Sequence, residues 1–270
     1  MSRLMISLDK NILNPHSAVA RRMIEYGKQD ELFIMVPAYK QTRIDLSPAV
    51  HVFSVSGNKV FQFFGLYRLG RELIKEHRIQ SITTQDPFFA GLAGWRLSQH
   101  AHIPLEVQVH GDFYGSNYYR NSGLANLVHY YIGLFVIPHA NTIRCVGERI
   151  KQSLIARGIS KEKIIIQPVR VDTEYIKNYQ SQFDVHKKYP DVGKIFLCLG
   201  RFDKVKNIPW LIEVFAKVAH KHSGALLLIV GEGAEKNRIT QKIKELKMEK
   251  NIQMEGWTND PNSYLKTVDC

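Results

Sequence analysis

Short apolar runs alternate with longer amphipathic stretches along almost the whole chain. A run that is apolar throughout predicts a strand buried in a parallel sheet, whereas apolar positions that recur every three or four residues predict a helix. The first half contains seven predicted strands, at residues 4–8, 32–36, 50–54, 79–84, 105–109, 142–146 and 163–167. The second half contains three, at residues 195–199, 225–230 and 251–254.

Helical patterns separate these strands. They fall at residues 17–26, 59–78, 88–100, 123–138, 148–157, 207–222, 234–247 and 261–266. Such alternation indicates βαβ units and parallel sheets that helices cover on both faces. We predict an α/β chain with two Rossmann-like domains that face a cleft. The first spans residues 1–172 and a polar connector spans 173–193. The second, at 194–270, is incomplete, because the chain stops where a fourth strand would begin. We therefore expect a C-terminally truncated protein.

The composition is that of a globular protein with an unusual excess of positive charge. Of the 270 residues, 44% are hydrophobic and 23% charged, and the net charge is +12. This excess favours anionic partners, namely phosphorylated small molecules, acidic lipid headgroups or nucleic acid. Nucleic acid is the weakest of these, because no basic block with interleaved aromatics is present. Three widely spaced cysteines predict neither a disulfide framework nor a zinc site, and they fit a reducing, cytoplasmic setting.

The predicted helix at residues 59–78 has two interpretations. Its first half is apolar nearly all round, and its second half carries several cations. A helix buried against the sheet is the favoured reading, but an interfacial helix in peripheral contact with an anionic membrane, at its inner face, stays open. The longest apolar stretch, near residues 127–137, is well short of the roughly 20 residues that a spanning helix needs.

A basic loop follows the apolar strand at residues 195–199. It begins at Gly200 and carries Arg201 and Lys206, and Asn207 can cap the next helix, with Pro209 in its first turn. Ligands of open α/β sheets bind at the carboxyl ends of the strands. Because Arg offers a fork of donors and Lys a compact charge, the pair suits a diphosphate. From the spacing alone, a solvated basic loop is equally compatible.

Other polar residues follow predicted strands in the same way. Asp9, Asp86, His110 and Asp112 do so in the first half, and the second half has a Gly-Glu-Gly turn at residues 231–233. His110 is the best catalytic candidate, since imidazole exchanges protons near neutral pH, although a lone His is more often structural. The turn lacks the third Gly of a dinucleotide fingerprint but precedes a helix N-terminus, where a phosphate or sugar could meet backbone N–H groups.

Three segments in the second half resemble a known family. They read FLCLGRFDKVKN at residues 196–207, LIVGEG at 228–233 and IQMEGW at 252–257. Upstream, VHGD at 109–112 and RCVGERIKQSL at 144–154 match more loosely. In order and spacing these segments are similar to the GT-B-fold glycosyltransferases, specifically the family-4 group of retaining enzymes.

The resemblance implies transfer of a sugar from a nucleotide-diphosphate donor to a hydroxyl of a glycan or lipid-linked glycan, with retention and without a metal or other cofactor. Arg201 and Lys206 match the pair that holds the donor diphosphate, and His110 matches a histidine at the sugar. The resemblance also implies that Gly200, Gly231 and Gly233 belong to the loops at the donor. The acceptor side is expected to include Asp9, Asp86 and Asp112.

The chain departs from the family pattern at three places. The loop at residues 9–16 lacks the usual Gly-Gly, and the turn at 169–172 reads VRVD. The family's acidic motif, a pair of glutamates, would lie just beyond Cys270. Two alternatives therefore remain: a non-catalytic module that binds an anion or a partner, and a sugar-nucleotide epimerase of similar architecture.

Overall fold

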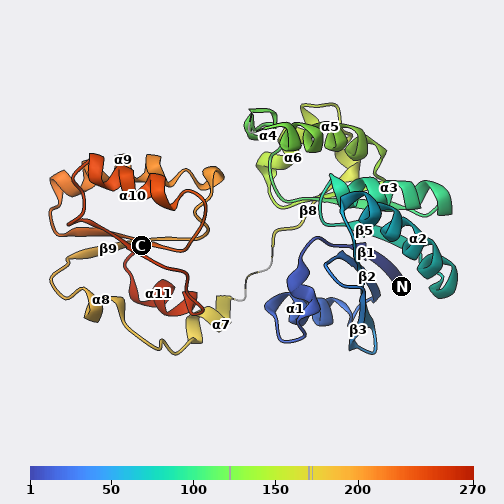
Figure 1. Ribbon diagram of the computed structural model, residues 1–270, viewed down its shortest axis with the longest axis horizontal. Coiled ribbons are helices and arrows are strands. Elements are labelled where there is room, and N and C mark those ends of the chain that lie inside the picture. Colours follow the sequence, from blue (N-terminus) through green and yellow to red (C-terminus); the bar gives the residue numbers. More distant parts are fainter. Residues whose placement is uncertain (122, 170, 172) are drawn as a thin grey trace. The chain divides into compact units, whose positions relative to one another are not determined.

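The computed structural model describes residues 1–121, 123–169, 171 and 173–270. It divides into two compact units, Met1–Val169 and Arg170–Cys270 (Figure 1). The residues predicted as a connector, 173–193, belong to the second unit. The predicted departure at residues 169–172 includes Arg170 and Asp172, which lie outside the described residues.

The first unit is built on an eight-stranded sheet with the order β3-β4-β2-β1-β5-β6-β7-β8. Its strands are β1 (Ser2–Ile6), β2 (Glu31–Pro37), β3 (Thr42–Ser47), β4 (Val50–Val55), β5 (Ser81–Thr84), β6 (Leu105–Val109), β7 (Thr142–Cys145) and β8 (Ile164–Ile166). All neighbours are parallel except β3 and β4. The strand order reverses on either side of β1, which is where ligands bind in such sheets.

The sequence predicted seven strands here, and β3 is the one it missed. Residues Thr42–Ser47 pair antiparallel with β4 at the sheet edge, with a register shift between Asp45 and Ser47. The strand alternates polar and apolar residues and none of its side chains is fully buried. It therefore lacks the continuous apolar run by which the buried strands were recognised.

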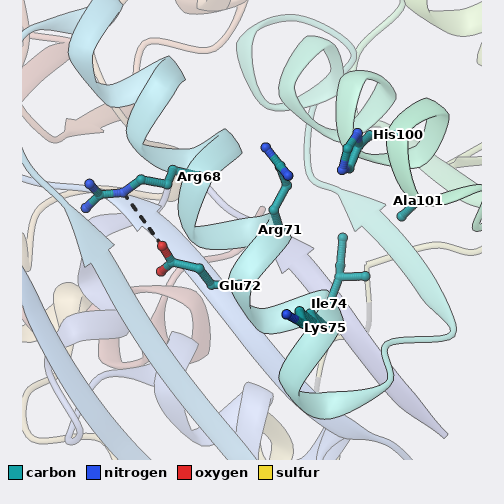
Figure 2. A pocket seen from close by; sticks show the side chains of 7 residues that line it. All are labelled: Arg68, Arg71, Glu72, Ile74, Lys75, His100 and Ala101. Carbon is teal, nitrogen blue, oxygen red and sulfur yellow. Dashed lines mark ion pairs between the residues drawn. The ribbon is translucent and has the colours of Figure 1, made fainter.

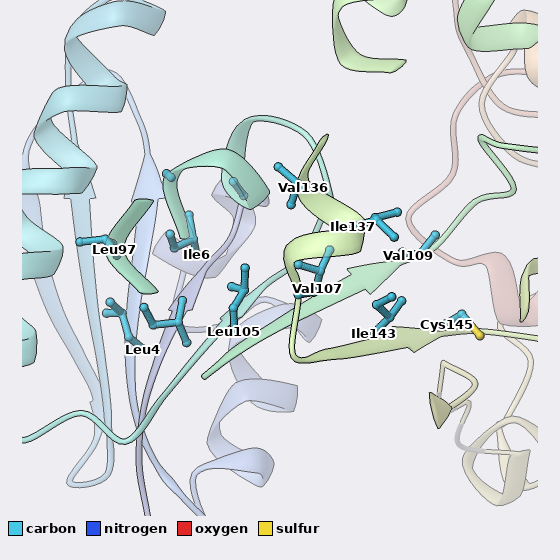
Figure 3. Close-up of a cluster of buried hydrophobic side chains, with 14 of the residues drawn as sticks. Leu4, Ile6, Leu97, Leu105, Val107, Val109, Val136, Ile137, Ile143 and Cys145 are labelled. Atoms are coloured by element: carbon cyan, nitrogen blue, oxygen red, sulfur yellow. The ribbon is translucent and has the colours of Figure 1, made fainter. Parts of the chain in front are cut away.

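Helices cover both faces of this sheet, as predicted. They are α1 (Ala18–Tyr26), α2 (Lys59–His77), α3 (Phe89–Ala101), α4 (Tyr118–Asn121), α5 (Leu124–His139) and α6 (Glu148–Ile155), with 3-10 turns η1 (Lys10–Leu13) and η2 (Lys161–Lys163). On one face, Leu97 of α3 and Val136 of α5 pack over Leu4 and Val107 (Figure 3). On the other face, Met23 of α1 belongs to a separate core.

The second unit has a three-stranded parallel sheet with the order β11-β10-β9. Its elements are α7 (Thr173–Asn178), α8 (Val185–Lys188), β9 (Lys194–Leu199), η3 (Lys204–Lys206), α9 (Ile208–Lys221), β10 (Ala225–Val230), α10 (Lys236–Glu245), β11 (Ile252–Glu255) and α11 (Pro261–Thr267). Phe215 of α9 and Ile239 of α10 share one core, and Val185 and Tyr264 share another. This unit is therefore also covered on both faces.

The last residues of the chain pair with the outer edge of β9. The amide of Asp269 donates to the carbonyl of Ile195 at 3.1 Å, and the amide of Leu197 donates to the carbonyl of Cys270 at 2.7 Å. These are the residues at which the sequence predicted a fourth strand. In the described part of the chain, no helix combines the length and apolarity needed to cross a membrane.

Candidate active site

A pocket opens at the carboxyl ends of the central strands in the first unit. Its cavity measures about 130 Å³, and its lining includes Asp9, Gln85 and His110. Asp9 follows β1 and Gln85 follows β5, so the pocket lies where the strand order reverses. Two of the predicted site residues, Asp9 and His110, thus come together here.

A chain of hydrogen bonds orients the imidazole of His110. Thr83 Oγ1 donates to Glu106 Oε1 at 2.8 Å, and Gln108 Nε2 donates to Thr83 Oγ1 at 3.1 Å. Gln108 is thereby fixed with its Oε1 3.3 Å from His110 Nε2. Because an amide oxygen only accepts, this contact requires the hydrogen on Nε2 and leaves Nδ1 as an acceptor.

Two arginines set the electrostatics of the pocket. Burial lowers the pKa of His110, and the positive charges of Arg144 and Arg22 lower it further. The imidazole is therefore neutral near neutral pH and can accept a hydrogen bond from a hydroxyl. Arg144 Nε is buried and has no hydrogen-bond partner among the described residues. It is a donor available to a bound oxygen.

Asp9 is tied into the loop after β1. Its Oδ1 accepts from the amide of Asn11 at 3.0 Å and so begins η1. Its own amide donates to Ser7 Oγ at 3.1 Å, and Ser7 donates to Gln85 Oε1 at 2.6 Å. The loop at residues 9–16 contains no glycine, and side-chain hydrogen bonds hold its start.

Asp86 does not line this pocket. Its Oδ1 accepts from the amide of Phe88 at 2.7 Å, next to the start of α3. Burial raises the pKa of Asp86, and hydrogen bonds from the amides of Phe88, Ala90 and Gly91 only partly oppose this. These contacts assign the carboxylate to the N-terminus of α3.

Asp112 also lies outside the pocket lining. It accepts from the amide of Gly115 at 2.8 Å and pairs with Arg149 Nε at 3.2 Å. Burial alone would raise the pKa of Asp112, but hydrogen bonds from Ser153, Gly115 and Arg149 hold it below its usual range. The geometry is that of a carboxylate that shapes the loop after β6.

In the second unit, Arg201 and Lys206 lie exposed in the loop after β9. Within the described part of the chain, neither forms a salt bridge with a carboxylate. Lys206 ends η3, and its charge acts on Cys198 of β9, where burial raises the pKa of the thiol and Lys206 opposes the rise. Both cations are therefore available to an anion at the end of this strand.

The two glycine loops of this unit are packed tightly against each other. The amide of Phe202 donates to the carbonyl of Glu232 at 2.9 Å, and a Cβ on Gly231 would lie 2.0 Å from the carbonyl oxygen of Gly200. A Cβ on Gly233 would lie 2.4 Å from the carbonyl oxygen of Phe202. Because these glycines have no Cβ, the two backbones can approach closely, and the loop that bears Arg201 packs against the turn at residues 231–233.

Asn207 does not cap α9 in the way the sequence predicted. It occupies the N-cap position, but its side chain accepts no capping hydrogen bond there. Its φ is 47°, in the left-handed region that Asn tolerates better than most residues. The residue instead turns the chain from η3 into α9. Pro209 lies in the first turn of α9, as predicted.

The pocket also contains polar residues that were not among the predicted site residues, and Arg22, Gln108 and Arg144 are the ones nearest in role to His110. The sequence could have indicated Arg144 as a site residue, because a charged residue inside a short strand such as β7 is unusual. Gln108 is a buried polar residue of β6, and its place in the sequence indicates a site residue less strongly. Arg22 lies on the amphipathic helix α1, where an arginine is unremarkable.

Comparison with known proteins assigns the chain to a family. The family described as Glycosyltransferase Family 4 matches residues 18–175, which is more than half of the chain. The chain belongs to Glycosyltransferase Family 4. The family described as Glycosyl transferases group 1 matches residues 180–270, so the two matches account for both units.

Two curated relatives match part of the chain. The alpha-monoglucosyldiacylglycerol synthase of Streptococcus pneumoniae is 22% identical over 248 residues, which cover 87% of this chain and 55% of that protein. The N-acetylgalactosamine-N,N'-diacetylbacillosaminyl-diphospho-undecaprenol 4-alpha-N-acetylgalactosaminyltransferase of Campylobacter jejuni is 28% identical over 148 residues, covering 54% of this chain and 38% of that protein. The chain thus spans about half or less of the length of these relatives.

A solved structure shows the same fold. Anabaena HepE, determined in complex with UDP-glucose, superposes with a TM-score of 0.71 at 15% identity, covering 100% of this chain and 72% of HepE. The α/β architecture with a large parallel sheet is therefore that of the GT-B glycosyltransferases, as the sequence predicted.

Proposed function

We propose that the chain is a retaining glycosyltransferase that moves a sugar from a nucleotide-diphosphate donor to a hydroxyl of a glycan or lipid-linked acceptor. The observation that carries this proposal is a pair of exposed cations, Arg201 and Lys206, that form no salt bridge with any described carboxylate and lie on the loop packed against the Gly-Glu-Gly turn. Membership of Glycosyltransferase Family 4 supports the same reaction class. The free cysteines fit a cytoplasmic site of action.

In the proposed reaction the two cations bind the donor diphosphate. Negative charge grows on this group as the glycosidic bond breaks, and a guanidinium and an ammonium offset it without a metal. His110 accepts a hydrogen bond from a sugar hydroxyl at Nδ1, while Gln108 holds the ring. UDP-glucose is the first donor to test, because HepE binds it. The names of the relatives, with diacylglycerol and diphospho-undecaprenol, support a lipid-linked acceptor.

Calorimetric titration of the chain with UDP tests the donor site. We expect binding that Arg201→Ala weakens about ten- to a hundredfold, since a hydrogen bond to a charged group contributes roughly 1.5–3 kcal/mol. Lys204→Ala, which removes an exposed neighbouring cation from the same loop, is the matched control and should bind like the parent chain. Equal affinity in all three proteins would refute the assignment of Arg201.

Turnover separates this proposal from a binding module. We expect the chain to release UDP from UDP-glucose in a way that depends on His110 and Arg201, measured by chromatography of the nucleotides. Binding without any turnover would instead assign the 270 residues to the class of non-catalytic anion-binding modules.

A further inference from the structure

Helix α2 has one face that the protein core does not cover. Along it, Phe61, Phe64, Arg68, Arg71 and Lys75 recur at intervals of three and four residues, so they form one row on the helix surface. The two phenylalanines are 69% and 63% exposed, and the three cations are exposed as well. The row is therefore aromatic at its N-terminal end and basic at its C-terminal end.

Helix α5 carries a second exposed apolar row. Leu124, Val128, Tyr131 and Phe135 follow one another at the same helical intervals. Leu124 is 77% exposed and Tyr131 is 62% exposed. The opposite side of α5 supplies residues to the core, so the helix is apolar on both sides. Exposed apolar surface of this extent marks an interaction site.

The two rows belong to one layer of helices. Helix α3 lies between α2 and α5 on the same face of the sheet (Figure 1). Aromatic contacts connect the N-terminal ends: Phe63 of α2 meets Phe89 of α3 at 6.1 Å between ring centroids, and Phe88 stacks on His129 of α5 at 5.2 Å. The charge of Lys59 at the start of α2 acts on His129.

A basic groove continues the α2 row toward the end of α3. Arg68, Arg71 and Lys75 project from α2, and His100 lines the groove from α3 (Figure 2). The cavity measures about 540 Å³. Glu72 is the acidic residue of its lining, and it is 3.8 Å from Arg68 Nε. The groove therefore keeps an excess of positive charge.

We propose that this helical layer docks on a membrane rich in anionic phospholipids. The apolar rows of α2 and α5 enter the boundary between headgroups and acyl chains, and the basic groove binds the phosphates of the headgroups. Aromatic and aliphatic side chains next to Lys and Arg are favoured at this boundary, because the apolar groups leave water while the charged groups stay at the headgroups. Charge complementarity identifies the occupant, because a groove with three cations and one carboxylate attracts an anionic surface within a Debye length. The docking does not depend on the transfer reaction.

Flotation with vesicles tests the proposal. We expect the chain to float with equimolar phosphatidylglycerol and phosphatidylcholine but not with phosphatidylcholine alone, and to be released at about 1 M salt, where the Debye length is about 3 Å. Arg71→Gln/Lys75→Gln should lower the partition coefficient about fivefold for each cation removed. Phe61→Ser/Phe64→Ser should also lower it, since both rings are exposed and the core stays intact.

Matched variants on helix α9 of the second unit provide the controls. Lys217→Gln/Lys221→Gln removes the same charge, and Trp210→Ser/Val214→Ser removes comparable exposed apolar surface. Both should float like the parent, and circular dichroism checks that every variant folds. Equal loss of binding in groove and control variants would overturn the proposal. So would self-association that Phe61→Ser/Phe64→Ser abolishes without any vesicle binding, because a second copy would then cover the apolar rows.

Discussion

Arg144 enters the pocket of the first unit from β7, where the residues on either side of it in the strand, Ile143 and Cys145, are buried and apolar. A guanidinium there must be hydrogen-bonded or must serve a ligand, because an unpaired buried polar group costs free energy. Its Nε has no hydrogen-bond partner in the described part of the chain, and its charge acts on His110. At the scale of single residues, burial and then the charge of Arg144 lower the pKa of His110 and favour its neutral form.

Removing either arginine should raise the pKa of His110. In Arg144→Gln and in Arg22→Gln, a positive charge that opposes protonation is lost, so the pKa moves up toward 6.5. NMR titration of the His110 ring proton measures this. Arg21→Gln, at the exposed neighbouring position on α1, is the control and should leave the midpoint in place.

The same shift has a consequence for stability. Because the pKa of His110 is lower in the folded state, the unfolded chain binds the proton first, and stability falls as the pH drops below 6.5. Arg144→Gln should reduce this loss. An unchanged His110 midpoint in both arginine variants would contradict the electrostatic role given to them.

Gly231 is a residue at which a single methyl group should disrupt the loop that bears Arg201. Its φ is 146°, and a Cβ would lie 2.0 Å from the carbonyl oxygen of Gly200. Gly231→Ala should lower the free energy of unfolding by about 1–3 kcal/mol from backbone strain alone, as measured by denaturant titration. Gly147→Ala has open space around the added carbon and an extended backbone, and should be close to neutral.

At the scale of elements, continuous apolar runs made the sheet predictable. The buried strands β6 and β10 were predicted with their observed bounds, and every other parallel strand was found within a few residues. Strand β3 was missed because an exposed antiparallel edge strand needs only alternating polar and apolar residues, and it therefore has no continuous apolar run. The glycine turn after β10 was recognised from the sequence, but its packing against the loop after β9 was not, since that contact joins segments about 30 residues apart.

The candidate sites were predictable to different degrees. Residues that directly follow a strand, such as His110 and Arg201, were recognisable from their place in the pattern. Arg22 and Gln108 were not, because they belong to the interior of regular elements and only the sheet order brings them to the pocket. Asp86 and Asp112 follow strands too, but their carboxylates are used locally. Asp86 accepts a hydrogen bond at the start of α3, and Asp112 accepts one in the loop after β6.

Asp269 connects the C-terminal segment to β9 and should make this edge sensitive to acid. Its Oδ2 accepts from the amide of Ile195 at 2.8 Å, and its Oδ1 pairs with Lys194 at 2.9 Å. The bond to the Ile195 amide, followed by Lys194, lowers the pKa of Asp269 to about 2. Since the folded pKa is depressed, this stabilisation is present above the ordinary aspartate pKa of 3.8 and is lost as the pH falls toward 2.

Urea denaturation of Asp269→Asn at a series of pH values checks this. The variant should be less stable than the parent at neutral pH, and the difference should shrink as the pH falls below about 4. Asp191→Asn, which removes an exposed carboxylate from the same unit, should show no such trend. A stability difference that stays constant with pH would rule out the carboxylate as its source.

At the scale of the whole molecule, each unit has its own cores. The two clusters of the first unit draw residues from the sheet around β1, and those of the second from the sheet around β10. Both units therefore have the apolar interior that a domain needs. A substitution in one core should act on that unit.

Leu227→Ala tests this independence. Leu227 is a buried residue of β10 in the core beneath α9 and α10, and truncating such a leucine costs about 2–5 kcal/mol. Hydrogen exchange followed by mass spectrometry should show faster exchange in peptides from β9 to β11 and unchanged protection in peptides from β1 to β7. Leu105→Ala in β6, buried to the same degree, should give the reverse pattern. If either variant accelerated exchange equally in both sheets, the two units would unfold as one cooperative body, and the loops that bear Arg201 and His110 would share a single stability.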